Sequence, residues 1–130
     1  MTSKAETLAA AMGAVSQGDV DRFGDILLSD EIVWHWPGKS SMAGDYRGRA
    51  AALDLIRGFH RLTGGRLSVE PLDILEGAEH LMSFTHIRAE KAGQQLDVTM
   101  ADAMRFGPDG RVVEYWTLSN DQEAVDTFLG

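Results

Sequence analysis

The pattern of apolar and polar residues changes at Arg66, and this change constrains the fold more than any other feature of the sequence. After Arg66, strand-like runs follow one another over residues 66–75, 81–90, 95–106 and 111–118. The glycine-containing breaks between them are short enough to be hairpin loops, so the four runs are predicted to pair as an antiparallel meander. Pro71 lies inside the first run and cannot donate a ladder hydrogen bond, which predicts an edge strand, a bend or a bulge there.

The residues before Arg66 follow a helical period instead. Ser3 and Glu6 fit a capping box, and apolar residues then recur every three or four positions up to Val15. Further helices are predicted over residues 19–27, 49–62 and 120–129, with a short strand over residues 32–36 and a loop over residues 39–48. Helices followed by a meander indicate a single α+β domain over residues 1–130, in which helices pack on a curved antiparallel sheet and leave a cone with one open end.

Composition excludes several classes of function. The net charge of −8 repels nucleic acid and anionic lipid, so neither is an expected partner. The sequence contains no cysteine, which removes disulfides, thiol nucleophiles and thiolate metal sites. No apolar run approaches the roughly 20 residues of a membrane span, and the N-terminal residues lack the apolar core of a signal peptide, which predicts a cytoplasmic protein.

Several segments of the sequence resemble the nuclear transport factor 2-like superfamily. They are Gln17–Val20, Ser29–Gly38 and Ala43–Gly48 in the front half, and Asp102–Phe106 and Gly110–Trp116 in the back half. Within that superfamily the chain most resembles the SnoaL-like relatives of polyketide cyclases and the ketosteroid isomerases, over nearly its whole length. The resemblance implies a cone-shaped α+β barrel of the cystatin-like type with an apolar pocket, paired as a homodimer through the outer face of the sheet.

The resemblance also indicates two catalytic residues. His35 stands where ketosteroid isomerases have their general-base carboxylate, and an imidazole could act as that base. Asp102 stands where they have a protonated oxyanion donor, and strand alternation puts it among apolar neighbours, where a lone carboxylate should face a ligand or be paired. We therefore expect Asp102 to have a raised pKa, or to form an ion pair with His35 or His86. Both residues also have a purely structural interpretation, as hydrogen-bonded polar groups on strands.

Candidate ligand-binding residues are mostly aromatic. They are Trp36, Tyr46, Phe59, His86, Met104, Tyr115 and Trp116. Aromatic side chains are core material first, and alternation shows only that Trp34 and Trp36 share a face opposite His35. Some of these aromatic residues should therefore lie at a subunit interface, and His60 and His80 have the pattern of surface residues.

A metal site remains an alternative interpretation of the polar residues. His35, His86 and Asp102 would form a two-histidine, one-carboxylate set if they converged, although the sequence has no short metal-binding motif. We expect no metal and no cofactor.

Two positions depart from the relatives. Ala11 stands where ketosteroid isomerases have a tyrosine donor, and Thr117 stands where limonene epoxide hydrolase-like relatives have an aspartate. The expected function is the binding of a small apolar molecule, with cofactor-free isomerisation or aldol-type cyclisation by acid–base proton transfer if the protein is an enzyme. A non-catalytic ligand-binding protein and a dimerisation module of the same fold are the alternatives.

Overall fold

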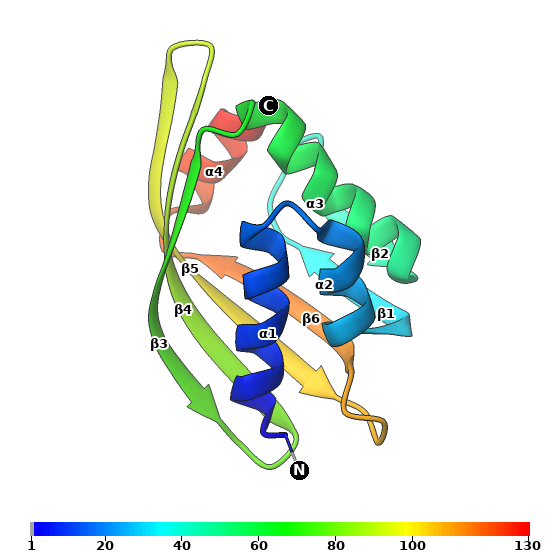
Figure 1. Ribbon diagram of the computed structural model, residues 1–130. Helices are drawn as coiled ribbons and strands as arrows, with labels where there is room; N and C mark the ends of the chain where they lie inside the picture. The colour runs from blue at the N-terminus through cyan, green and yellow to red at the C-terminus, as the bar shows by residue number, and fades with distance from the viewer. Residues whose placement is uncertain (1) are drawn as a thin grey trace.

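The computed structural model describes residues 2–130 as helices packed on one curved sheet (Figure 1). The helices are α1 (Lys4–Ser16), α2 (Val20–Leu27), α3 (Arg49–Thr63) and α4 (Gln122–Leu129). The strands are β1 (Leu28–Trp36), β2 (Gly44–Arg47), β3 (Leu67–Glu76), β4 (His80–Lys91), β5 (Gln94–Phe106) and β6 (Val112–Ser119). No helix within this described part of the chain is long and apolar enough to cross a membrane.

The predicted meander is confirmed. The strand order is β2-β1-β6-β5-β4-β3, and each pair from β3 to β6 is antiparallel. Pro71 lies on β3, which is an edge strand, and the pairing of β3 with β4 shifts register between Pro71 and Asp73. The sequence signal at Pro71 therefore marks both an edge and an irregularity in the ladder.

Two features of the sheet correct the expectations from sequence. Residues 44–47, predicted to lie in a loop, form β2 and pair with β1. The sequence did not indicate this strand because four residues are too few to show an alternating pattern. The sheet is also not antiparallel throughout, since β1 pairs with β6 in parallel. β2 and β3 are its two edges, so the sheet curves around the helices without closing into a complete barrel.

The helices all pack against one face of the sheet, which we call the inner face. One apolar cluster joins α1, α2 and α3 to β1, β5 and β6, and a second joins α4 to β4 and β5. Along β4 and the middle of β5 the inner residues alternate with more exposed ones, as expected for strands covered on one side. Figure 1 shows α1, α2 and α3 lying across the concave side of the sheet, with α4 beyond them at one end.

Candidate functional site

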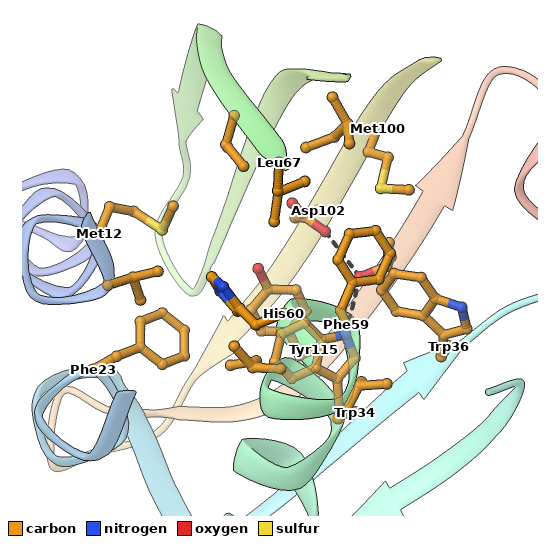
Figure 2. A pocket seen from close by; sticks show the side chains of 16 residues that line it. Met12, Phe23, Trp34, Trp36, Phe59, His60, Leu67, Met100, Asp102 and Tyr115 are labelled. Atoms are coloured by element: carbon orange, nitrogen blue, oxygen red, sulfur yellow. Dashed lines mark hydrogen bonds between the residues drawn. The ribbon is translucent and has the colours of Figure 1, made fainter. Parts of the chain in front are cut away.

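A pocket of about 160 Å³ lies between the helices and the inner face of the sheet (Figure 2). Its lining residues come from α1, α2 and α3 and from every strand except β2, and nearly all are aromatic or aliphatic. The exceptions are Asp102, Thr117 and His60, together with the hydroxyl group of Tyr115. Asp102 is thus the single carboxylate among the lining residues of the described chain, in otherwise apolar surroundings.

Asp102 is held by a chain of two hydrogen bonds that runs through the sheet. Asp102 on β5 pairs with Thr117 on β6, so both side chains lie on the inner face. Thr117 Oγ1 donates to Asp102 Oδ1 over 2.9 Å, and Trp34 Nε1 donates to Thr117 Oγ1 over 2.9 Å. Because an indole N–H can only donate, the single hydroxyl proton of Thr117 is directed to Asp102. Oδ1 is therefore an acceptor in this chain, and a proton on Asp102 resides on Oδ2.

The environment of Asp102 alters its proton affinity. Burial raises the pKa of Asp102 to about 6, while the hydrogen bond from Thr117 favours the charged form and opposes that rise. No lysine or arginine lines the pocket within residues 2–130, so no cation offsets the desolvation. The side chain keeps some accessible surface, which faces the cavity that it lines. Asp102 is therefore mostly ionised at neutral pH and within easy reach of its protonated form.

Tyr115 and Trp34 form the wall beside Asp102. The parallel pairing of β1 with β6 puts Trp34 opposite Tyr115, and their rings stack with centroids 3.9 Å apart. Burial and the charge of Asp102 raise the pKa of Tyr115 well above its usual value, so its hydroxyl stays protonated. Tyr115 is only 6% exposed, and its hydroxyl has no hydrogen-bond partner among residues 2–130. This O–H group can donate to a molecule in the pocket.

His35 lies on the opposite, outer face of the sheet. Both of its neighbours on β1 line the pocket, so alternation directs the imidazole outward. Its Nδ1 is 2.7 Å from Asp45 Oδ1, and its Nε2 is 2.7 Å from Glu114 Oε2. The ring also stacks on Trp116, with centroids 5.7 Å apart. The imidazole is thus fully engaged outside the pocket.

The two carboxylates around His35 determine its charge. Ionised carboxylates only accept hydrogen bonds, so both ring nitrogens must carry protons and His35 is an imidazolium in this arrangement. The hydrogen bonds to Asp45 and Glu114 raise the pKa of His35. In return, His35 and then Arg105 lower the pKa of Glu114. The outer face therefore holds a paired charge cluster.

The sequence from residue 8 to residue 115 matches the family model described as the SnoaL-like domain. The chain belongs to the SnoaL-like family.

Solved structures share the fold over nearly the full SnoaL-like chain. Bal32a, from a soil-derived mobile gene cassette, is 29% identical with a TM-score of 0.91, covering 98% of this chain and 96% of that one. A protein of cystatin-like fold from Xanthomonas campestris is 22% identical with a TM-score of 0.88, covering 99% of each chain. IdmH from Streptomyces antibioticus, proposed to be a polyketide cyclase, is 21% identical with a TM-score of 0.73, covering 92% of this chain and 94% of IdmH. None of the curated proteins matches the sequence significantly.

This SnoaL-like structure does not bring the expected catalytic pair together. Asp102 faces the pocket and His35 faces outward, so the expectation of one shared site is corrected. His86 also faces outward, where its Nε2 lies 2.5 Å from Asp97 Oδ1. Asp102 therefore has no ion pair with either histidine, and the three residues do not form a metal site. Within residues 2–130 no cluster of three or more suitable side chains could hold a metal ion.

The candidate ligand-binding residues divide between the pocket and its surroundings. Trp36, Phe59 and Tyr115 line the pocket, and their role in ligand binding stays a prediction. The other candidates do not line it. Tyr46 donates its hydroxyl to the Met42 carbonyl, Met104 is fully buried in the core, and Trp116 and His86 lie on the outer face.

Sequence reasoning missed three hydrogen-bonding side chains of the pocket. His60 was expected at the surface but lines the cavity, and its spacing of four residues from Ile56 could have placed it on the apolar side of α3. Thr117 lies two residues after Tyr115 and so shares its face. Trp34 was recognised as aromatic but not as a hydrogen-bond donor, which only the pairing of β1 with β6 reveals.

Proposed function

We propose that this SnoaL-like protein is a cofactor-independent enzyme that moves a proton to and from carbon in a small, mostly apolar molecule with a carbonyl or hydroxyl group. Isomerisation and aldol-type cyclisation are the reactions that fit. The supporting observation is Asp102, a lone carboxylate in an apolar pocket, with a pKa raised to about 6 and one oxygen engaged by Thr117. Such a group is ionised at neutral pH and is a stronger base than an ordinary aspartate.

In the proposed reaction, Asp102 Oδ2 takes the proton from a carbon next to a carbonyl group. The C–H electron pair becomes the carbon–carbon double bond of an enolate, and the carbonyl π pair moves to oxygen. The Tyr115 hydroxyl can donate a hydrogen bond to that oxygen as its charge develops. In an isomerisation, Asp102 returns the proton to a conjugated carbon. In a cyclisation, the enolate carbon attacks a second carbonyl, and the resulting alkoxide takes the proton.

The size of the pocket supports a ligand of about one ring. Its volume of about 160 Å³ is similar to that of a protein cavity of about 150 Å³ that accepts benzene. IdmH, which shares the fold, is itself proposed to be a polyketide cyclase. That likeness supports the architecture, and the chemistry of Asp102 supports proton transfer.

The ring opening of 5-nitrobenzisoxazole tests the proposed base directly. This compact two-ring compound needs only the loss of one carbon-bound proton. The C–H pair then forms a nitrile, and the N–O bond breaks to release a coloured phenolate. We expect saturable turnover by the wild-type protein and a loss of about 10²–10⁴-fold in Asp102→Asn. Asp97→Asn, on the outward side of the same strand, is the matched control and should keep wild-type turnover.

Two outcomes would count against this proposal. Equal turnover by Asp102→Asn and the wild-type protein would refute Asp102 as the base. If the wild-type protein has no turnover but binds small ring compounds, as measured by quenching of tryptophan fluorescence, the protein is a non-catalytic ligand-binding module instead.

We also propose that the protein is a homodimer paired through the outer face of the sheet. Two rows of apolar side chains cross that face from β4 to β6. One row contains Phe84, Ala101 and Leu118, and the other contains Met82 and Trp116. Leu118 is 51% exposed, and within residues 2–130 the helices pack on the inner face instead. Exposed apolar patches of this kind mark interfaces.

Light scattering of a single outer-face variant tests this assembly. We expect a dimer for the wild-type protein and a monomer for Leu118→Asp, because the substitution buries a charge in the interface. Ala9→Asp on the exposed side of α1 should leave the dimer intact. A wild-type monomer at micromolar concentration would contradict the proposal.

A further inference from the structure

His60 occupies a position of α3 where the helix pattern calls for an apolar residue. It follows Ile56 by four positions and precedes the buried Thr63 by three, which puts the three side chains on one side of the helix. Ile56 lines the pocket together with His60 itself. A polar, partly buried side chain on this apolar stripe therefore reaches the cavity.

The pocket has its polar groups on two opposite walls. Asp102 and the Tyr115 hydroxyl belong to the sheet, whereas His60 belongs to the helix layer that covers it. Figure 2 shows the imidazole of His60 reaching into the cavity from α3 while Asp102 enters it from β5. Among residues 2–130 no side chain hydrogen-bonds the ring nitrogens of His60, in contrast to His35 and His86. The ring is thus available to a ligand held between the two walls.

We propose that His60 is a second catalytic residue, whose ring N–H donates to an oxygen of the same ligand from which Asp102 removes a carbon-bound proton. This inference rests on the proposed function and narrows its substrate class. The substrate is a ring-sized molecule, such as an enolisable ketone, with its acidic C–H group directed at Asp102 and an oxygen within reach of His60.

The step balances with the ring N–H of His60 acting as a hydrogen-bond donor. Asp102 takes the proton from carbon, the C–H pair forms the new carbon–carbon double bond, and the carbonyl π pair moves to oxygen. The ring N–H of His60 donates a hydrogen bond to that oxygen, which leaves a hydrogen-bonded enolate and a protonated Asp102. Asp102 returns the proton to carbon when the product forms, which restores its carboxylate, so no other reactant is required.

The dependence of turnover on the leaving group tests this role. In the ring opening of benzisoxazoles, a donor to the departing oxygen matters most when the phenolate formed is the more basic one. Removal of the donor in His60→Leu should therefore reduce turnover of 5-chlorobenzisoxazole about 10²-fold and reduce turnover of 5-nitrobenzisoxazole less. His60→Gln keeps an N–H donor and should recover part of the loss. His80→Leu, at the exposed start of β4, is the matched control and should behave as the wild-type protein does.

A direct measurement on the wild-type protein covers the case in which His60→Leu fails to fold. The reaction product 2-cyano-4-nitrophenol should shift the NMR signals of the His60 ring more than those of His35, His80 and His86. Unchanged His60 signals at saturation, or an unchanged leaving-group dependence in a folded His60→Leu variant, would overturn the role of His60. If Asp102→Asn loses turnover while His60→Leu keeps both rate and dependence, only this inference fails. Turnover retained in Asp102→Asn refutes the proposed function itself.

Discussion

The two faces of the sheet change the proton affinity of their carboxylates in opposite directions. On the inner face, Asp102 receives a hydrogen bond from the neutral hydroxyl of Thr117, and burial raises its pKa to about 6. On the outer face, Glu114 lies beside the His35 imidazolium, and its pKa is lowered. Successive residues of β1 and β6 belong alternately to the pocket on the inner face and to the charge cluster on the outer face. The side of a strand, rather than its place in the sequence, therefore decides whether a carboxylate becomes a base or one half of an ion pair.

The largest expected difference between the faces concerns stability. Burial raises the pKa of Asp102 from 3.8 to about 6, so the folded state binds a proton more tightly than the unfolded state. Wild-type stability therefore falls as the pH rises from about 4 to about 6, and Asp102→Asn avoids that loss. We expect Asp102→Asn to be about 1–3 kcal/mol more stable at pH 8 in urea denaturation, with no difference near pH 4. Glu114→Gln should be destabilising at pH 8, and an equal response of the two variants would contradict the opposite pKa shifts of the two faces.

The second prediction concerns the pH dependence of turnover. If ionised Asp102 is the base, turnover of 5-nitrobenzisoxazole should rise about tenfold between pH 5 and pH 8, with a midpoint near 6. Glu114→Gln should leave this midpoint unchanged because the carboxylate faces away from the pocket. Values of kcat/KM in overlapping buffers provide the measurement, and a flat profile would argue against Asp102.

A smaller effect should follow from the loss of the hydroxyl group on Thr117. Its hydrogen bond lowers the pKa of Asp102, so Thr117→Val should raise that pKa further and move the midpoint of the pH–rate profile upward. Turnover at pH 7 should then fall by a few-fold. Thr85→Val replaces a buried threonine that does not line the pocket and serves as the control. A midpoint that moves equally in both variants would mean that the hydrogen bond from Thr117 has no specific effect.

The smallest effect is expected for His35→Gln. The pKa of His35 is raised in the folded state, so its contribution to stability is complete below about 6.5 and is lost as the pH rises through the raised value. The variant should lower the free energy of unfolding by less than about 1 kcal/mol at pH 6, because this ion pair is partly exposed, and by less still at pH 9. Thermal unfolding at the two pH values measures this. Turnover should be unaffected, and a loss of turnover would indicate that His35 has a catalytic role after all.

Local patterns in the sequence predicted the meander, the irregularity at Pro71 and the apolar neighbours of Asp102, because alternation and turn residues act over a few positions. The same patterns could not relate one strand to another. Alternation put Trp34 and His35 on opposite faces of β1, but only the parallel pairing with β6 shows that Trp34 shares the face of Thr117 and Asp102. The expected pairing of His35 with Asp102 was wrong because the sequence did not show which face of β1 lies on the side of Asp102.

His60 was missed for a different reason. Its place on α3 has the spacing of the apolar stripe, but a single histidine on an amphipathic helix gives no indication of whether the helix covers a packed core or a cavity. That distinction depends on the curvature of the sheet and on the gap between the two apolar clusters, which arise from the whole chain.

The edge position of Pro71 has a consequence for aggregation. β3 is ten residues long, almost wholly exposed, and carries large apolar side chains such as Leu72 and Leu75. An open edge of this kind is a template on which strands from other molecules can add. Proline has no N–H group to offer, and the register shift beside it interrupts the row of free donors and acceptors. A foreign strand could therefore pair with only a short stretch on either side, which discourages edge-to-edge growth.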